Sequence, residues 1–206
     1  MNGFLASLEG RLSPPEAWGD FRPGARPAAV VALLHKDGGE WSLPFVRRRP
    51  DLPDHPGQVA LPGGVVRPGE TAWEGARREL EEEIGVPGGA ARPLGAGSPV
   101  YTAVSNFSVV PFVAVVDGGP ARFRHDAYEL EGILQVPLTR LLEETAWRAS
   151  SQPWVGSHFP WQDTFIWGLT ARILDDLLPR FRSALEEQAR REGPRAPRGE
   201  GSPPPP

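Results

Sequence analysis

Three glutamates, Glu79, Glu82 and Glu83, stand at spacings of three and four residues within a run whose apolar residues have a helical period. At ~100° per residue, a helix places these three carboxylates on one shoulder of its surface. Like charges at such spacings repel, and the repulsion grows when the carboxylates are partly removed from water. A hard cation such as Mg²⁺ or Mn²⁺ relieves this repulsion, because it prefers carboxylate and carbonyl oxygens and shares them with phosphates. A solvated acidic surface is the ordinary alternative, and the helix taken alone favours it.

The helix that carries these glutamates has clear ends in the sequence. Thr71 and Glu74 have the spacing of a capping box, and Gly85 stands where a glycine typically ends a helix. The stripe that we expect to face the core consists of Trp73, Ala76, Leu80 and Ile84. The sequence therefore predicts a helix from about residue 71 to 84 with the glutamates beside its buried face.

The rest of the chain alternates between strand and helix signals. Residues 28–35 and 41–47 predict a β-hairpin, and residues 105–116 predict another long strand. Further helices are expected over residues 3–12, 137–144 and 166–190, with Pro179 as a candidate break in the last. This order indicates an α+β fold. We divide the chain into an N-terminal helix and linker (1–26), one domain (27–191) and a flexible, proline-rich tail (192–206).

Composition excludes several classes of function. The net charge of −4 gives no concentrated positive field for nucleic acid, and no apolar run approaches the length of a membrane span. The absence of cysteine removes disulfides, thiol nucleophiles and cysteine-bound zinc. We therefore expect a soluble, cytoplasmic protein that binds a small molecule, with no nucleic-acid or membrane partner.

The segment from Gly64 to Val86, GVVRPGETAWEGARRELEEEIGV, resembles the Nudix box. Every fixed position of that motif is filled, by Gly64, Glu70, Arg78, Glu79, Leu80, Glu82, Glu83, Gly85 and Val86. So many matches at set spacing make chance a poor explanation, and they favour the metal site over the solvated surface. The resemblance implies a Nudix hydrolase with a mixed β-sheet sandwiched between α-helices, which agrees with the α+β expectation.

The resemblance also assigns roles by position. It implies that Glu79, Glu82 and Glu83 are catalytic and hold Mg²⁺ or Mn²⁺, together with the carbonyl oxygen of Gly63. It further implies four structural residues: Glu70 and Arg78 as an ion pair that fixes the loop to the helix, and Gly64 and Gly85 for backbone geometry. For the general base, Glu82, Glu129 and Glu131 stay open.

Flanking segments are similar to a coenzyme A diphosphatase branch of the family. The upstream pieces are residues 47–50 (RRRP) and 55–64 (HPGQVALPGG), although Arg49, Pro53 and Leu61 depart from the branch signature. Downstream, residues 105–113, 135–138 and 166–174 are also similar. The branch implies hydrolysis of coenzyme A to 3',5'-ADP and 4'-phosphopantetheine. The candidates for contact with the substrate phosphates are Arg47, Arg48, Arg49 and His55.

Two other functions remain open from the sequence. One is a Nudix hydrolase of another nucleoside diphosphate compound, such as ADP-ribose or a dinucleoside polyphosphate. The other is a catalytically silent Nudix domain that senses a nucleotide. Four aromatic residues are candidates for stacking on a base, but such residues are more often part of a core, and we rank none of them as a site residue: Tyr101, Phe107, Trp154 and Trp161.

Overall fold

The computed structural model describes residues 3–14, 17–19, 21–87, 89–116, 123–152 and 156–193. Trp154 and nearly all of the proline-rich tail lie outside these ranges. The main strands are β1 (Arg26–Asp37), β2 (Glu40–Arg48), β3 (Val59–Ala60), β4 (Gly63–Val65), β5 (Ala91–Ala96), β6 (Val100–Thr102), β7 (Phe107–Val116) and β8 (Leu130–Pro137). The helices are α1 (Gly3–Glu9), α2 (Ala72–Ile84), α3 (Leu138–Leu141) and α4 (Gly168–Glu192).

One mixed sheet organises the molecule. Its strand order is β3-β2-β1-β7-β5, and β4 pairs with β1, β6 with β7 and β8 with β2. β1 and β7 are parallel, with Ala28 opposite Val109, whereas the other pairs in this sheet are antiparallel. The expected hairpin is β1 and β2, and it turns at Gly38 and Gly39, both with positive φ.

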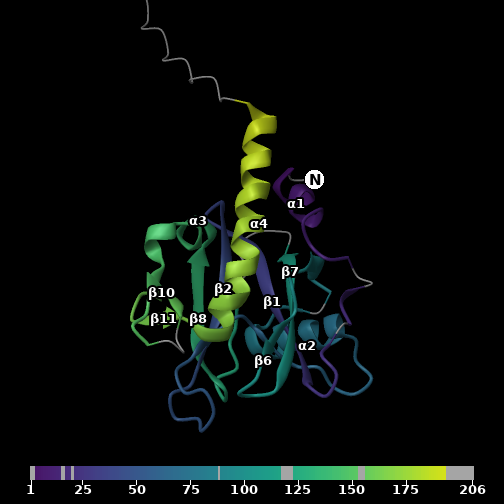
Figure 1. Ribbon diagram of the computed structural model, residues 1–206, viewed down its shortest axis with the longest axis vertical. Coiled ribbons are helices and arrows are strands. Elements are labelled where there is room, and N and C mark those ends of the chain that lie inside the picture. Colours follow the sequence, from purple (N-terminus) through teal and green to yellow (C-terminus); the bar gives the residue numbers. More distant parts are fainter. Residues whose placement is uncertain are drawn as a thin grey trace, which may run out of the picture.

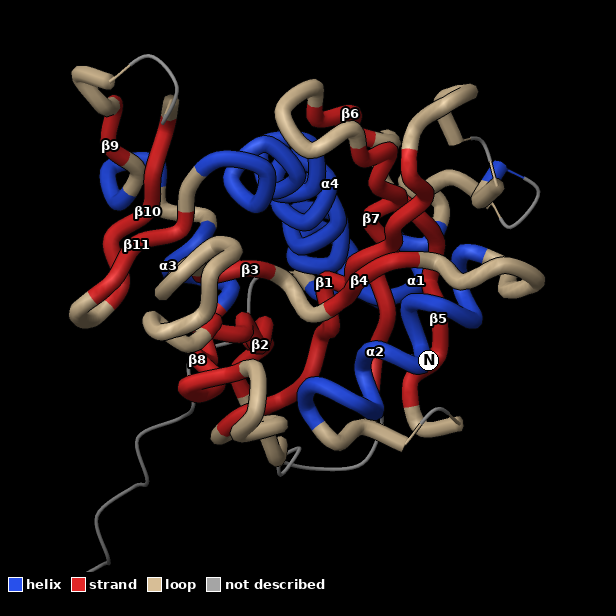
Figure 2. The backbone as a smooth tube through the Cα atoms, turned by 90° about the horizontal axis from the view of Figure 1, so that it is seen from below, coloured by secondary structure: helices blue, strands red, loops and turns tan. Residues whose placement is uncertain are grey.

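Alternate residues of β1 face two separate hydrophobic cores, because successive side chains of a strand point to opposite faces of the sheet. The core on one face contains Ala28, Ala32 and Leu34 of β1 and is shared with α1 and α4. The core on the other face contains Ala29, Val31 and Leu33 and is shared with α2. Figure 2 shows α4 and α2 on opposite sides of β1. The expected α+β architecture, a mixed sheet between helices, is therefore confirmed.

Helix α4 differs from the expectation of a break at Pro179. It runs from Gly168 to Glu192 as one helix (Figure 1). A proline inside a helix removes one hydrogen bond and costs about 3 kcal/mol. Three neighbouring side chains are buried in the core, Leu177, Leu178 and Phe181, and each such burial contributes roughly 1.5–3 kcal/mol. Packing on the sheet therefore outweighs the cost of the proline.

The region between β7 and α4 also differs from the expected pattern. The segment 137–144 forms only the short helix α3, followed by a 3₁₀ turn, η2 (Glu144–Ala146). A separate three-stranded sheet follows, made of β9 (Arg148–Ala149), β10 (Ser157–Trp161) and β11 (Thr164–Ile166). Among the described residues, no helix is long and apolar enough to cross a bilayer.

Candidate functional site

Helix α2 is fixed at both ends and along its buried face. The Thr71 hydroxyl accepts from the Glu74 amide while the Glu74 carboxylate accepts from the Thr71 amide, so the capping box is complete. Gly85 ends the helix in the left-handed conformation, with φ of 69°. On the stripe that was expected to be buried, Ala76, Leu80 and Ile84 are fully buried, and Trp73 is partly buried against the same core. The glutamates consequently stand on a rigid support.

Arg78 gathers three carboxylates around one guanidinium group. Its nitrogens lie 2.8 Å from Glu70, 2.6 Å from Glu79 and 3.0 Å from Glu82. A further bond from Arg78 to the carbonyl oxygen of Val65, at 2.9 Å, ties the helix to β4. The hydrogen bond from Arg78 is the largest cause that lowers the pKa of Glu70, to about 2. Much of the repulsion expected between the acids is thus relieved within the chain.

Glu83 has a different environment. Its carboxylate accepts a hydrogen bond of 2.9 Å from the amide of Gly63. Burial is the main cause that raises the pKa of Glu83 to about 8; the Gly63 amide and Arg48 oppose the rise, and Glu79 and Glu129 add to it. The surrounding protein therefore stabilises the charged form of Glu83 poorly.

The two glycines of the preceding loop leave space that no other residue would leave. A Cβ on Gly63 would lie 2.3 Å from the carbonyl oxygen of Ala29, and its φ of 148° is unfavourable for other residues. A Cβ on Gly64 would lie 2.7 Å from the carboxylate of Glu79. Gly64 thus provides room for a functional side chain, in addition to the backbone geometry expected of it.

The three acids share the shoulder of α2 without meeting at one point. Glu79 and Glu82 are bound to Arg78, whereas Glu83 is turned toward Gly63. Within the described part of the chain, no three histidine, aspartate or glutamate side chains lie close enough together to hold a metal ion. Their joint role as metal ligands therefore stays a prediction.

The arginines expected to contact phosphate diverge from one another. Arg47 binds Glu131 at 2.9 Å and Asp163 at 2.8 Å, and the second contact joins β2 to the turn between β10 and β11. Arg49 binds Asp51 at 2.6 Å.

Arg48 and His55 are the members of this group that line a small pocket together with Glu83. Arg48 also lies 3.5 Å from Glu129. Of the four residues predicted to contact phosphate, Arg48 and His55 thus lie beside Glu83. Arg47 and Arg49 are bound to acids outside this pocket.

The pocket beside Glu83 adjoins a larger apolar cavity. The smaller pocket, of about 170 Å³, and the larger one, of about 480 Å³, share His55, Gln58 and Ala60. The far walls of the larger cavity come from the segments 102–107 and 167–172. The combined cleft is polar at the glutamates and apolar beyond them, which suits a phosphate compound with a large organic group.

The three candidates for the general base are in different positions. Glu129 directly precedes β8 and lies close enough to Glu83 to raise its pKa. Glu131 lies on β8 and is bound to Arg47, and Glu82 is bound to Arg78. Of these acids, Glu129 is the one whose neighbours, Arg48 and Glu83, both line the small pocket.

A family model of the NUDIX domain matches residues 25–155 of this chain, which is more than half of its length. The chain belongs to the Nudix hydrolases. A protein of Yersinia enterocolitica, "Uncharacterized Nudix hydrolase NudL", is 35% identical over 176 residues, covering 80% of this chain and 85% of the relative. The protein of the same name from Yersinia pestis is 32% identical over 158 residues, covering 74% and 77%.

Solved Nudix structures share the fold. An Ap4A hydrolase of C. elegans in a binary complex has a TM-score of 0.51 at 17% identity, with 79% of this chain and 98% of that chain covered. The NUDIX domain of Shewanella oneidensis NrtR, complexed with ADP ribose, has a TM-score of 0.51 at 15% identity, with 84% and 99% covered. At such identities the likeness concerns the fold. The family itself identifies an enzyme that hydrolyses nucleoside diphosphate derivatives.

Nudix hydrolases generally use divalent metal ions, and the residues present here suit such an ion. The available donors are carboxylate and backbone carbonyl oxygens, which hard divalent cations prefer. The space that Gly64 leaves is filled by the Glu79 carboxylate, and the buried Glu83 has a raised pKa that a nearby cation would lower. The donor set and its electrostatics therefore fit a divalent cation at the N-terminal loop and exposed shoulder of α2.

Two features of the site were missed by sequence reasoning. Arg67 donates its amide to Glu70 at 2.8 Å and places its guanidinium 3.5 Å from Glu82, which adds a second cation beside Arg78. The apolar cavity includes Trp167 and Val104, neither of which was a candidate, and Phe107, which was named without being ranked. No local pattern marks these residues, because the cavity forms from segments about 60 residues apart in the chain.

Proposed function

We propose that this Nudix hydrolase splits the diphosphate linkage of coenzyme A or one of its derivatives, giving 3',5'-ADP and 4'-phosphopantetheine. The observation that carries the proposal is that the small pocket at Glu83 and the apolar cavity lie side by side, with His55, Gln58 and Ala60 lining both. Coenzyme A has a charged diphosphate between a nucleotide and a long, uncharged arm that combines amides with methyl and methylene groups. The cleft offers both environments side by side, which a small and wholly polar substrate would not need.

Two side chains are proposed to hold the phosphates. Arg48 can bind phosphate through its fork of N–H donors, and the ring of His55 can donate a further hydrogen bond. Both line the small pocket with Glu83. Arg47 instead binds Asp163 in the turn between β10 and β11, and Arg49 is neutralised by Asp51.

The proposed ligands of the divalent cation, Mg²⁺ or Mn²⁺, are Glu79, Glu82, Glu83 and the carbonyl oxygen of Gly63. When bound there, the cation would neutralise charge that develops on the phosphate oxygens and favour deprotonation of water. Arg78 holds Glu79 and Glu82 close to this position. Glu79 and Glu82 would exchange Arg78 for the cation, and Arg78 would keep its ion pair with Glu70.

The reaction needs a group that accepts the proton of the attacking water. A carboxylate oxygen of Glu129 is proposed for this step, because Glu129 lies near both Glu83 and Arg48. Water adds to one phosphorus, the bond from that phosphorus to the bridging oxygen breaks, and the second phosphate leaves with the bridging oxygen. Glu82 remains the alternative base.

A substrate panel with product analysis tests the proposal. Coenzyme A, ADP-ribose and a dinucleoside polyphosphate are compared by kcat/KM with Mg²⁺ and with Mn²⁺. We expect coenzyme A to be preferred by at least about tenfold, or ~1.4 kcal/mol of transition-state binding. A preference for ADP-ribose or the dinucleoside would overturn the choice of substrate, and binding without turnover of any compound would indicate a sensing domain.

Neighbouring arginines offer a matched pair for the contact with phosphate. Arg48→Gln is expected to raise KM for coenzyme A by roughly tenfold or more, in the range of a lost charge-assisted bond. Arg49→Gln removes the same charge one residue away, outside the pocket, and is expected to change KM less than about twofold. Equal effects of the two variants would contradict the assignment of Arg48.

A further inference from the structure

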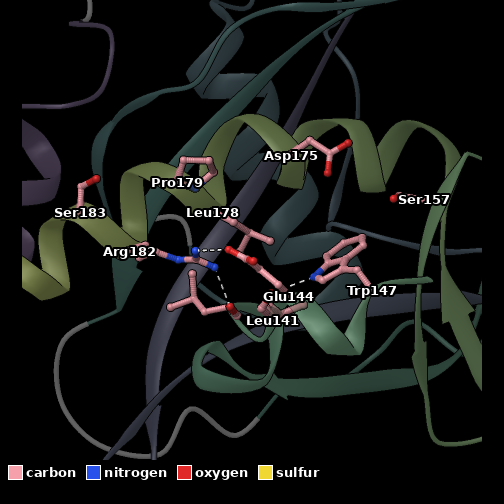
Figure 3. A pocket seen from close by; sticks show the side chains of 10 residues that line it. Leu141, Glu144, Trp147, Ser157, Asp175, Leu178, Pro179, Arg182 and Ser183 are labelled. Atoms are coloured by element: carbon pink, nitrogen blue, oxygen red, sulfur yellow. Dashed lines mark hydrogen bonds and ion pairs between the residues drawn. The ribbon is translucent and has the colours of Figure 1, made fainter. Parts of the chain in front are cut away.

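A second cavity lies on the other side of the sheet from α2, between α4 and the segment that contains α3 and η2 (Figure 3). It has a volume of about 380 Å³, within the size range of small-molecule sites. Its apolar walls include Leu141, Leu178 and the ring of Trp147. None of its lining residues belongs to the cleft beside Glu83.

The charges that line this cavity have a net negative sign. Arg182 is bound to Glu144 and also donates to the carbonyl oxygen of Leu142 at 2.7 Å, so this cation is already neutralised. Asp175 is the second carboxylate, and within the described residues it has no hydrogen bond or ion pair. Asp175 is exposed to solvent, and desolvation by the surface around it raises its pKa, as expected for a carboxylate near apolar surface without a counter-charge. One negative charge is therefore left without compensation.

A backbone acceptor lies beside this carboxylate. Pro179 is one helical turn after Asp175, and both residues line the cavity (Figure 3). Because proline has no N–H, α4 lacks the hydrogen bond that residue 179 would otherwise donate to the carbonyl oxygen of Asp175. The side chains of Asp175 and Pro179 are four residues apart and lie on one face of α4. The wall of the cavity thus carries a carboxylate beside a carbonyl oxygen that lacks its usual helical donor.

The aromatic ring of the cavity is held in place independently. The indole nitrogen of Trp147 donates to the carbonyl oxygen of Leu141 at 2.9 Å, and its ring packs on Phe159 with centroids 5.4 Å apart. In Figure 3 the Asp175 carboxylate points from α4 toward the end of the cavity where Trp147 lies. A fixed aromatic ring near an unpaired carboxylate is an arrangement that attracts organic cations.

We propose that this cavity is a binding site for a small primary ammonium compound with an apolar body. The ammonium group has three N–H donors, which match the carboxylate and the carbonyl oxygen of Asp175. The apolar body contacts Leu141, Leu178 and the ring of Trp147. An anionic ligand is disfavoured, because Glu144 already holds Arg182 and Asp175 repels a second negative charge.

Benzylamine is a suitable probe, compared with benzyl alcohol and benzoate as ligands of the same shape with different charge. Each is titrated into the full-length protein labelled with ¹⁵N, and the indole N–H signal of Trp147 is followed by NMR. We expect saturable shifts with benzylamine and a Kd on the order of 1 mM, the affinity that so small a ligand can reach. Benzyl alcohol and benzoate should bind at least about tenfold more weakly.

Three variants separate this proposal from adventitious binding. Asp175→Asn should weaken benzylamine binding roughly tenfold, and Pro179→Ala, which restores the missing N–H, should weaken it about threefold. Glu186→Gln removes a carboxylate from an exposed position on the same helix outside the cavity and should leave binding within about twofold.

The proposal is overturned if no saturable shift occurs up to roughly 10 mM. Equally tight binding of benzoate, or undiminished binding by Asp175→Asn, would also overturn it. The two main variants should keep the fold, because one replaces an unpaired carboxylate with an amide of the same shape and the other removes a helix-disfavouring residue. None of these outcomes depends on the substrate of the hydrolase.

Discussion

Replacing Glu83 with glutamine should stabilise the metal-free protein while abolishing its activity. Glu83 is mostly buried, and its pKa is raised from 4.5 to about 8. For an acid with a raised pKa in the folded state, stability is fully present below 4.5 and is lost as the pH rises from 4.5 to about 8. At about 1.4 kcal/mol for each pH unit, the loss approaches ~5 kcal/mol at pH 8.

This value is an upper bound, because the side chain still faces the small pocket and water there screens its charge. We expect a difference of roughly 2–5 kcal/mol between wild type and Glu83→Gln at pH 8.5, and little difference at pH 5. Glutamine keeps the acceptor for the Gly63 amide but carries no charge. The same substitution removes a proposed metal ligand, so turnover should fall by at least about 100-fold.

Chemical unfolding in EDTA from pH 5 to pH 9 measures the effect on stability. Glu81→Gln is the matched control, because Glu81 lies on the same helix and is exposed. Addition of Mg²⁺ at pH 8.5 should stabilise the wild type, by ~2.7 kcal/mol at 100 times Kd, and leave Glu83→Gln nearly unchanged. If the two proteins have the same pH dependence in EDTA, or if the variant retains activity within about tenfold, our account of Glu83 is wrong.

Three other expectations concern single residues. Gly64→Ala should reduce kcat at least about tenfold with a small change in unfolding free energy, because the new Cβ would displace the Glu79 carboxylate; unchanged kcat would contradict this. His35 is fully buried, and burial lowers its pKa against the opposing effects of Asp37 and the Lys36 backbone. Its stabilising contribution is therefore complete above pH 6.5 and is lost as the pH falls below 6.5. The unfolding free energy of the His35→Phe variant, with Asp37 left unchanged, should therefore depend less on pH between 5 and 7 than that of the wild type. Arg47→Gln should raise KM several-fold at constant kcat, since it releases Asp163 and the β10–β11 hairpin; a fall in kcat alone would argue for a direct catalytic role.

Features that depend on local chemistry could be predicted from the sequence. The capping box at Thr71, the final glycine at Gly85 and the buried stripe of α2 each follow from residues within one turn of one another. The long apolar strands β1 and β7 were recognisable because both of their faces are buried. Weak strands were missed, as in β8, where most side chains remain partly exposed and Gly132 interrupts the pattern.

Features that depend on tertiary contacts could not be predicted from local patterns. The apolar cavity requires the segments 102–107 and 167–172 to lie close together, and no local pattern in either segment indicates that contact. The divergence of the arginines was only partly open to prediction. Consecutive side chains of a regular strand point to opposite faces, but the pairing of β2 with β8 is irregular between Arg47 and Arg48. Alternation along the chain therefore does not by itself decide which arginine lines the small pocket.

Repulsion among the acids of α2 was one reason to expect a cation beside them, and Arg78 weakens that reason. One guanidinium already binds Glu70, Glu79 and Glu82, so these acids coexist without a metal ion. Glu83 has no such partner, and its carboxylate relies on the Gly63 amide and on distant Arg48. The electrostatic need for a cation is thus concentrated at Glu83. A divalent cation at that carboxylate would also attract Glu79 and Glu82 away from Arg78. Glu70 would keep Arg78 in place, so that the two carboxylates could bind it again once the cation leaves.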